Sequence, residues 1–589
     1  MFKIFTMFSK RDFALIALSV GLTVLGVWAD LQIPTYMRDI VLVATGEVYG
    51  TSADVWRTGG IMMGFAGLGF LVATIVGFIG AIVSSSHSRI LRERLFKKVG
   101  DFSSAEMQSF SVPSLITRST NDIVQVRVFT AMAIGILIRS PITAIWAITR
   151  TVNTSFELSL VPIATIAITA VVLVVLTSIA LPRFRRIQKL TDRLNENSRE
   201  NITGIRVVRA YNAAEFEQGK FTETNTSIKK NAYIAAGALA IFWPYIGIML
   251  AGLSLALYWV GSWIITSGRT DDPGAFFADM MVFIQYSGMI VSGFLMMIFV
   301  LTMLPRALVS GRRVHEVIST TPTITDRVAQ SDGGFSHSSN NGDIRFENVS
   351  LQYKGAESKI LCGIDLTIKK NSTVAFIGNT GSGKSTLISL LPRINDATEG
   401  KITIGGTDIK DFSQFDLHNI VGYVPQTAVI FGGTIKSNID LGETEKDQKD
   451  LTDEEIWNAI DLAQAKEFVS KLDDGLDHKV AQGGTNLSGG QKQRLGIARV
   501  LARKPKVIIF DDTFSALDYK TDMKLRTAIR KNLKDTTVII VAQRIGTIRD
   551  ADQIFVLENN RIVASGKHTD LMKTSTVYKS IAASQGVTK

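Results

Sequence analysis

Six long apolar runs in the first half of the chain constrain its fold more than any other feature. They extend roughly over Phe13 to Ile33, Ile61 to Val83, Phe129 to Ile148, Leu158 to Leu181, Ala235 to Ile265 and Phe276 to Leu304. A helix needs about 20 residues to cross a bilayer, and each run approaches or exceeds that length. We therefore predict a polytopic α-helical membrane domain with six transmembrane helices over residues 1–319.

The basic residues between these runs indicate how the domain is oriented. The formal net charge is +11, and Lys and Arg gather in the second-to-third and fourth-to-fifth connections, for example at Arg92, Lys97, Arg185 and Arg193. Lys and Arg accumulate on the cytoplasmic side of membrane proteins. We expect a multi-pass protein of the cell (plasma) membrane, surrounded by lipid, with both termini cytoplasmic. This bias accounts for the positive charge without nucleic acid as a partner. The single cysteine, Cys362, excludes an intrachain disulfide.

Few residues within the runs are candidates for contact with a transported molecule. A polar side chain is costly in lipid and should face a cavity or another helix. Methionines can form a soft, repackable wall, although ordinary helix packing explains most of them equally well. The candidates are Asp30, Gln32, Asp279, Gln285, Tyr286, Met280, Met281, Met289, Met296, Met297 and Met303.

The composition changes after the sixth run. Residues 320–341 are polar, rich in Gly, Ser and Asn, and aperiodic, which is typical of a linker. From 342 to 589 short β-rich stretches such as "TVAFIG", "KVIIF" and "TVIIVA" alternate with helical ones. This alternation predicts an α/β domain in which crossover helices connect the strands of a sheet.

A phosphate-binding loop opens this domain. The segment after the strand "STVAFI" matches the P-loop pattern and comprises Gly378, Asn379, Thr380, Gly381, Ser382, Gly383, Lys384 and Ser385, with Thr386 in the helix that follows. Its glycines allow backbone N–H groups to surround phosphates, Lys384 neutralises the outer phosphates, and Ser385 can bind Mg²⁺. A second apolar strand ends in Asp511, a carboxylate suited to the magnesium shell. The pair predicts an ATP- and Mg²⁺-binding NTPase.

The segment Asn486-Leu-Ser-Gly-Gly-Gln-Lys-Gln-Arg is similar to the signature of ATP-binding-cassette (ABC) proteins. Six spans ahead of such a domain resemble an exporter half-transporter. The resemblance implies that Tyr353 stacks on adenine, that Gln426 faces the metal, and that residues 114–126 and 203–217 are coupling regions. It also implies head-to-tail pairing, in which Ser488, Gly489, Gly490 and Gln491 complete the ATP site of a partner chain.

Two positions depart from the family pattern. Asp512 stands where the family has a catalytic glutamate, and Gln543 stands where it has a switch histidine. Gln482 is a lesser change from glutamate ahead of the signature. The combination resembles the degenerate-site subunit of a heterodimeric multidrug-type exporter, in which a second half-transporter supplies the competent glutamate and histidine. The alternatives are a homodimeric exporter or lipid flippase with slow hydrolysis, and a nucleotide-gated channel or regulator. The resemblance points to hydrophobic, drug-like or lipid-like substrates.

Overall fold

The computed structural model describes residues 7–152, 156–326, 342–353, 355–442 and 451–586. The chain divides into two compact units. The first comprises residues 1–98 and 113–320, and the second comprises residues 99–112 and 321–589. Most of the predicted linker, residues 327–341, lies outside the described residues. Each unit is built on its own core.

Within the described residues, six helical segments are long and apolar enough to span a membrane, as predicted, and they make up most of the first unit. They extend over Lys10–Thr45, Ser52–Gly100, Val112–Val152, Phe156–Thr203, Ala214–Thr266 and Pro273–Ser319. The corresponding long helices are α1 (Lys10–Thr45), α2 (Ser52–Gly100), α5 (Ile123–Met132) with α6 (Arg139–Val152), α7 (Phe156–Thr203), α9 (Ala214–Ala240) with α10 (Phe242–Thr266), and α11 (Pro273–Ser319). α11 packs against α1, α6 and α10.

Local sequence signals define where the first and last of these helices begin. Ser9 caps α1 in a capping box, because its hydroxyl accepts a hydrogen bond from the Asp12 N–H and the Asp12 carboxylate accepts one from the Ser9 N–H. Asp272 caps α11 without a capping box: its carboxylate accepts hydrogen bonds from the Gly274 and Ala275 N–H groups, and Pro273 stands at the first helical position. These caps satisfy N–H groups that have no partner within the helix.

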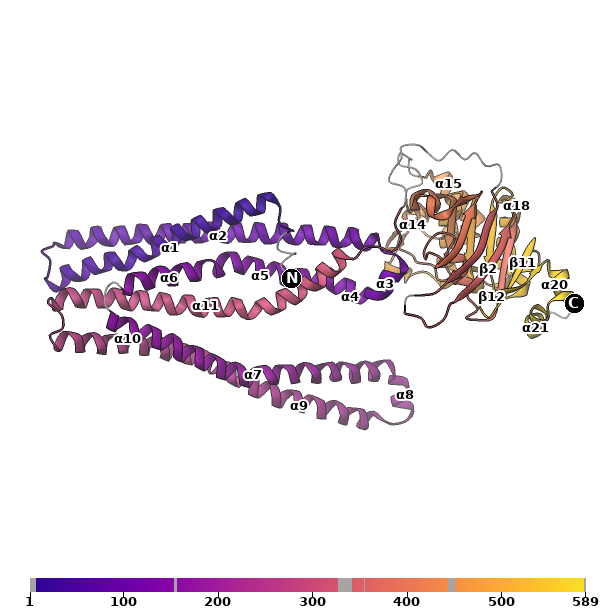
Figure 1. Cartoon of the computed structure of the whole chain (residues 1–589). Helices are drawn as coiled ribbons and strands as arrows, with labels where there is room; N and C mark the ends of the chain where they lie inside the picture. The colour runs from indigo at the N-terminus through magenta and orange to yellow at the C-terminus, as the bar shows by residue number, and fades with distance from the viewer. Residues whose placement is uncertain (1–6, 153–155, 327–341, 354, 443–450, 587–589) are drawn as a thin grey trace. The chain divides into compact units, whose positions relative to one another are not determined.

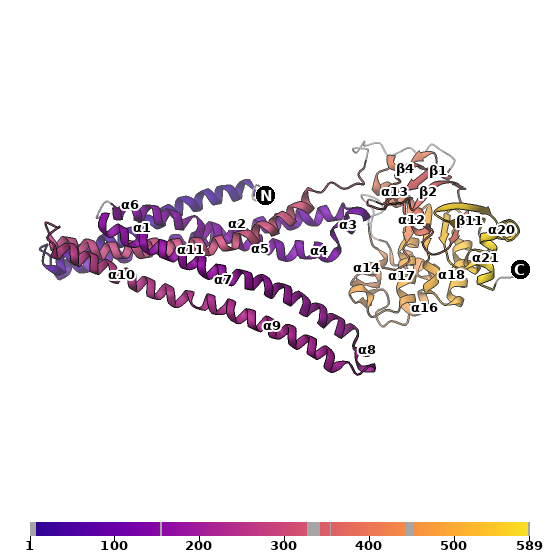
Figure 2. The ribbon, with the colours of Figure 1, turned by 60° about the horizontal axis from the view of Figure 1, so that its bottom comes forward.

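α2, α7 and α11 are each more than twice as long as a membrane span requires. α7 contains 48 residues and α9 contains 27. At about 1.5 Å per residue, α7 is about 72 Å long, more than twice the hydrocarbon thickness. α7 and α9 lie side by side, and the short helix α8 (Ile205–Ala210) joins them at their far end (Figures 1 and 2). α8 lies within the second predicted coupling region.

The first predicted coupling region has a different structure. Residues 114–126 form the end of α4 (Val112–Thr117), a π-helical turn over Arg118–Asp122, and the start of α5. The chain turns earlier, at α3 (Ser104–Phe110), which Ser103 and Glu106 cap. Both segments read as polar helices in the sequence, and periodicity does not reveal where a chain reverses direction, so a coupling role for residues 114–126 stays a prediction.

A six-stranded sheet in the order β12-β11-β3-β10-β9-β6 forms the centre of the second unit. Its strands are β3 (Thr373–Gly378), β6 (Val421–Val424), β9 (Val507–Asp511), β10 (Thr537–Val541), β11 (Gln553–Glu558) and β12 (Arg561–Gly566). The strands from β11 to β6 run parallel to one another, and β12 pairs antiparallel with β11 at the edge. The predicted α/β class is confirmed, and the continuous apolar strands β9 and β10 are buried throughout.

A smaller sheet and several helices complete this unit. The smaller sheet consists, in order, of β2 (Leu361–Ile368), β1 (Ile344–Leu351), β4 (Glu399–Ile404) and β5 (Thr407–Asp408). The helices that bear on the site are α12 (Lys384–Ser389), α17 (Gly489–Ala502), α18 (Tyr519–Asn532), α19 (Ile545–Ile548), α20 (His568–Thr574) and α21 (Thr576–Ser584). The other short helices are α13 (Gln414–Ile420), α14 (Ile435–Ile439), α15 (Asp453–Leu462) and α16 (Lys466–Val469).

Candidate nucleotide site

The P-loop links the carboxyl end of β3 to the amino end of α12. Gly381 and Gly383 have φ angles of 85° and 91°, a left-handed conformation that glycine adopts without steric cost. The Lys384 ammonium folds back onto the loop, where Nζ donates to the carbonyl oxygens of Gly378 and Asn379, each at 2.8 Å. The loop therefore has the shape that the sequence predicts for a phosphate cradle.

Lys384 lies in a poorly hydrated position. Only 8% of the residue is exposed. Burial lowers the pKa of its ammonium below the ordinary value, while the charges of Asp512 and Asp511 act in the opposite direction. A phosphate would compensate the charge of Lys384 at this position.

Asp511 is held at the tip of β9 by two hydroxyl groups. Ser385 Oγ donates to its Oδ1 at 2.8 Å, and the Tyr423 hydroxyl donates to its Oδ2 at 2.9 Å. The sequence assigned Ser385 and Asp511 to the same magnesium site but missed Tyr423, which lies on β6. The parallel pairing of β6 with β9 brings this hydroxyl to Asp511, and the order of strands is not visible in the sequence. Burial, followed by the charge of Asp511, raises the pKa of the Tyr423 hydroxyl.

Asp512 has a left-handed backbone, with φ 46° and ψ 26°. Its Oδ2 accepts hydrogen bonds from two side-chain amides, Gln543 Nε2 at 2.8 Å and Gln426 Nε2 at 3.1 Å. Burial and the nearby charge of Asp511 raise the pKa of the Asp512 carboxyl above its ordinary range, and the two amides and Lys384 oppose this effect. The two departures from the family pattern thus contact each other directly.

Asp512, Gln543 and Gln426 line a cavity of about 240 Å³, and Asp511 is not among its lining residues in the described part of the chain. It is lined by Ile360, Thr380, Gly381, Gly383, Lys384, Ser385, Thr386, Gln426, Asp512, Val541 and Gln543. No histidine belongs to this lining in the described part of the chain. Tyr353 is half-buried against the core of the smaller sheet and is not among the described lining residues, so its stacking on adenine stays a prediction. Ile360 is a lining residue that the sequence did not indicate.

The chemistry of three oxygen donors fits a magnesium ion. Mg²⁺ prefers oxygen ligands and usually shares them between one or two carboxylates, waters and the phosphates of its substrate. Ser385 offers a hydroxyl and Asp511 a carboxylate, and these two are in contact. Gln426 adds an amide on the same cavity wall. Magnesium would neutralise phosphate charge there.

The predicted signature stands at the start of a helix. Ser488 is the N-cap of α17, and its hydroxyl accepts a hydrogen bond from the Gln491 N–H at 3.3 Å. The Gln491 side chain in turn accepts one from the Ser488 N–H at 2.8 Å. Gly489 and Gly490 occupy the first two helical positions, where backbone N–H groups have no acceptor within the helix. Such an end favours a negatively charged group.

The charged residues of the membrane unit form ion pairs between helices. Asp30 on α1 pairs with Arg139 on α6, and Arg38 on α1 pairs with Asp279 on α11. The Tyr286 hydroxyl donates to the Leu31 carbonyl oxygen at 2.9 Å. Asp30, Asp279 and Tyr286 therefore connect helices, which is one of the two arrangements that the sequence allowed.

The remaining candidates in the membrane unit have mixed environments. Met280 is buried, and its side chain lies against Gly261. Met289 and Met303 pack against apolar clusters between helices, as ordinary helix packing predicts. Met281, Met297 and Gln32 are half-buried, while Met296 and Gln285 are exposed.

Comparison with known proteins finds a family match for the membrane part of the chain and another for its α/β part. The family model described as "ABC transporter transmembrane region" matches residues 16–293, and the model described as "ABC transporter" matches residues 361–515. An uncharacterized ABC transporter ATP-binding protein of Mycobacterium tuberculosis is 35% identical over 573 residues, covering 97% of this chain and 96% of that protein. One of Bacillus subtilis is 34% identical over 576 residues, with coverage of 97% and 96%.

A solved structure shares the fold of the whole chain. It is described as a bacterial Atm1-family ABC exporter with ATP bound, and it aligns with a TM-score of 0.76 at 22% identity, covering 98% of both chains. Together with the relatives, this likeness accounts for the six spans, the α/β domain and the order in which they occur. The chain therefore belongs to the ABC transporter family, as a multi-pass membrane protein that joins an exporter-type transmembrane domain to an ATP-hydrolysing domain.

Proposed function

We propose that this chain is one half of a heterodimeric exporter and that its own ATP site hydrolyses slowly. The observation that carries the proposal is the environment of Asp512. Its carboxylate is one methylene shorter than that of a glutamate, and its Oδ2 is engaged by the amides of Gln426 and Gln543. An amide can donate a hydrogen bond, but it has neither the positive charge nor the exchangeable proton of an imidazole.

The geometry of the remaining site supports ATP binding. The P-loop, Lys384, and the contact between Ser385 and Asp511 are arranged for phosphates and magnesium. We assign phosphate binding to residues 378–386 and magnesium binding to Ser385, Asp511 and Gln426. Retention of ATP with little turnover is the chemical behaviour that such a pocket favours.

The signature segment of this chain, residues 486–494, keeps the family pattern, whereas its own ATP site departs from that pattern. The capping box of Ser488 and Gln491 fixes the start of α17, and the first-turn N–H groups of Gly489 and Gly490 support a role in binding a γ-phosphate from another chain. We propose that a partner chain with an intact glutamate and histidine presents that phosphate. Hydrolysis then takes place mainly at the site that this chain completes for its partner.

The membrane unit would move the substrate. Closure of two nucleotide-binding domains around ATP, transmitted through the coupling segments, would open the transmembrane domain alternately to either side. We propose a plasma-membrane location with the termini and the nucleotide-binding domain in the cytoplasm, because the basic connections favour it. The substrate class that we propose is hydrophobic and drug-like or lipid-like.

Expression of the chain alone and together with a candidate partner tests this function. The partner would be a half-transporter from a neighbouring reading frame that carries the glutamate and the histidine. We expect slow ATP hydrolysis by the chain alone in lipid nanodiscs and a substrate-stimulated, fast rate for the pair. Brisk hydrolysis and transport by the chain alone would instead identify a homodimer. Passive flux on ATP binding without turnover would identify a channel.

A further inference from the structure

The switch segment between β10 and α19 leaves main-chain groups that its own neighbours do not satisfy. β10 ends at Val541 and α19 begins at Ile545, and this helix has only four residues. Its N-cap residue, Arg544, makes no side-chain capping hydrogen bond. The first N–H groups of a helix need an outside acceptor, and a carbonyl just beyond a strand needs an outside donor.

One side chain from the C-terminal end of the chain satisfies both needs. Gln585 Oε1 accepts a hydrogen bond from the Ile545 N–H at 2.8 Å, and Gln585 Nε2 donates to the Gln543 carbonyl oxygen at 2.7 Å. Only a side chain that carries a donor and an acceptor side by side can do this, and the amide of Gln or Asn is the simplest such group. Gln585 therefore replaces the missing cap and fixes the backbone from residue 543 to residue 545.

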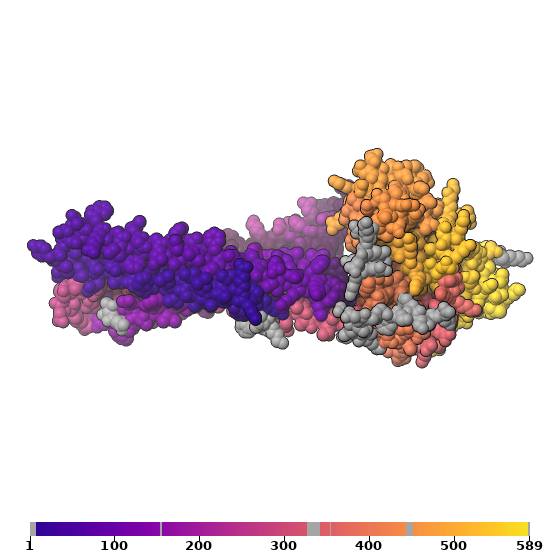
Figure 3. Space-filling model, turned by 90° about the horizontal axis from the view of Figure 1, so that it is seen from above, coloured from indigo at the N-terminus to yellow at the C-terminus, as the bar shows by residue number. Residues whose placement is uncertain are grey.

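Gln585 is itself attached to the core of the domain. It is the C-cap residue of α21, and its N–H donates to the carbonyl oxygens of Ala582 and Ala583. Tyr578 and Ala582 on α21 are fully buried, and the Tyr578 hydroxyl lies 2.8 Å from His568 Nδ1. The yellow C-terminal residues lie at one edge of the unit in Figure 3. The amide of Gln585 thus reaches the switch segment from a firmly packed helix.

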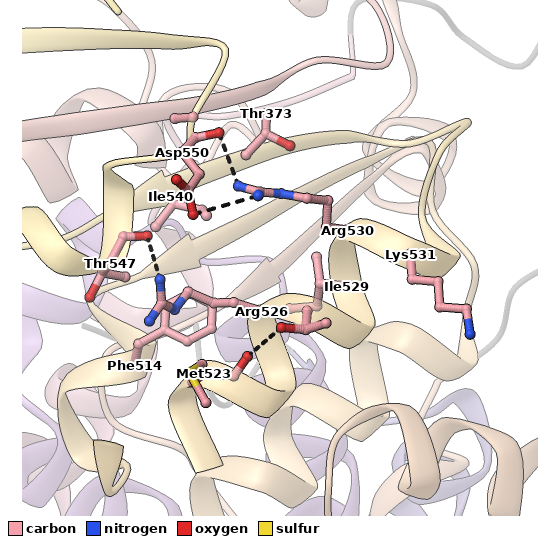
Figure 4. A pocket seen from close by; sticks show the side chains of 12 residues that line it. Thr373, Phe514, Met523, Arg526, Ile529, Arg530, Lys531, Ile540, Thr547 and Asp550 are labelled. Atoms are coloured by element: carbon pink, nitrogen blue, oxygen red, sulfur yellow. Dashed lines mark hydrogen bonds and ion pairs between the residues drawn. The ribbon is translucent and has the colours of Figure 1, made fainter. Parts of the chain in front are cut away.

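A second residue contacts the C-terminal half of α19, the short helix that follows the switch segment. Arg526 on α18 donates to the carbonyl oxygens of Gly546 at 2.8 Å and Thr547 at 3.4 Å, and Figure 4 shows it reaching Thr547. The Asp522 carboxylate pairs with the same guanidinium. Because Gln585 binds the start of α19 and Arg526 binds its C-terminal half, α19 is fixed at both ends.

The side chain that this arrangement directs is Gln543. Its Nε2 donates to Asp512 Oδ2 at 2.8 Å, in the cavity where ATP is expected. We infer that Gln585 is a positioning residue for ATP hydrolysis at this chain's own site, because it holds the switch backbone so that the Gln543 amide meets Asp512. The inference applies equally to pairing with a different chain and to pairing of two copies.

A double-mutant cycle on the full-length chain in lipid nanodiscs tests this role. Single-turnover cleavage of ATP is followed over hours, with Lys384→Ala as the blank, so that a slow site remains measurable. We expect Gln585→Ala to lower the cleavage rate about tenfold. The affinity for ATP should change less than twofold, because the P-loop is not touched.

The cycle distinguishes positioning from a general loss of structure. If Gln585 acts through Gln543, Gln585→Ala adds no further loss to Gln543→Ala, whereas a general defect multiplies the two losses. Gln585→Glu keeps the acceptor for the Ile545 N–H but sets an oxygen against the Gln543 carbonyl, so it should lower the rate as well. Ser584→Ala is the matched control, since among the described residues its hydroxyl donates to the Ile581 carbonyl oxygen within α21.

Hydrogen exchange supplies an independent readout. The Ile545 amide should exchange faster in Gln585→Ala and at the wild-type rate in Ser584→Ala. Multiplicative losses in the cycle, a wild-type rate no higher than the blank, or unchanged exchange at Ile545 would each overturn the inference.

Discussion

Lengthening Asp512 should restore hydrolysis at this chain's own site. In Asp512→Glu the carboxylate moves outward by one carbon–carbon bond, about 1.5 Å. The present carboxylate is drawn to Gln543 at 2.8 Å and Gln426 at 3.1 Å on the cavity wall. A displacement of about 1 Å in a catalytic group can change a rate by about 100-fold.

We therefore expect Asp512→Glu to raise the rate of ATP hydrolysis by about 10- to 100-fold. In free energy this is about 1.4 to 2.7 kcal/mol of additional transition-state stabilisation. The left-handed backbone at φ 46° suits aspartate better than glutamate, so the variant should lose up to about 1 kcal/mol of folding stability. That loss affects the amount of folded protein and does not reduce the rate per folded molecule.

The assay is ATP turnover by the purified chain in lipid nanodiscs at saturating Mg²⁺ and ATP. Asp512→Asn is the matched control, because it keeps the shape of the side chain and removes its charge, and it should fall to the Lys384→Ala blank. Adding Gln543→His to Asp512→Glu should raise the rate again. If Asp512→Glu changes turnover by less than twofold, the length of this side chain does not limit hydrolysis at the site, and the explanation is wrong.

Three further changes test other parts of the molecule. Ser488→Ala removes the N-cap of α17 at a cost of about 1 kcal/mol and should slow hydrolysis by the assembled pair more than tenfold, while ATP binding at this chain's own P-loop, measured with a fluorescent ATP analogue, stays unchanged. Arg139→Ala leaves the Asp30 carboxylate without its cation and should lower stability by roughly 1 to 3 kcal/mol; thermal unfolding in nanodiscs should show recovery when Asp30→Ala is added, and no recovery would contradict the pairing. Burial, followed by the charge of Arg549, lowers the pKa of His568 in the folded chain, so protons bind the unfolded chain more tightly and stability should decline as the pH falls below about 6.5. His568→Gln should weaken this decline between pH 7.5 and 5.5 in thermal unfolding, and an identical decline in both proteins would show that His568 does not cause it.

The nucleotide site was readable from the sequence to the extent that its residues are adjacent in the chain. The P-loop is one continuous segment, and its pattern specifies which backbone groups meet phosphate. Ser385 and Asp511 were both assigned to the magnesium site because the carboxyl ends of parallel strands meet at one edge of a sheet, although β10 lies between β3 and β9. Tyr423 and Gln585 were missed since their positions depend on which strands and helices are neighbours.

In the membrane unit, too, local features were predicted from the sequence and tertiary contacts were not. The six spans were predicted because apolar length is a property of each segment by itself. The reversal at α3 was not predicted, because that segment has no distinct composition. The ion pairs of Asp30 and Asp279 were also undetermined, since a charge in an apolar run requires a partner but does not identify it.

The sequence by itself determined the two kinds of domain, the order in which they occur, and the family, because hydropathy and the phosphate-binding motifs are local properties of the chain. Only the tertiary structure brought Asp512 between two amides, placed Tyr423 on Asp511, and fastened the switch segment with Gln585. Those contacts join residues between 31 and 88 positions apart. Folding brings them together through the order of the strands and the packing of the last helix, and no local pattern encodes either.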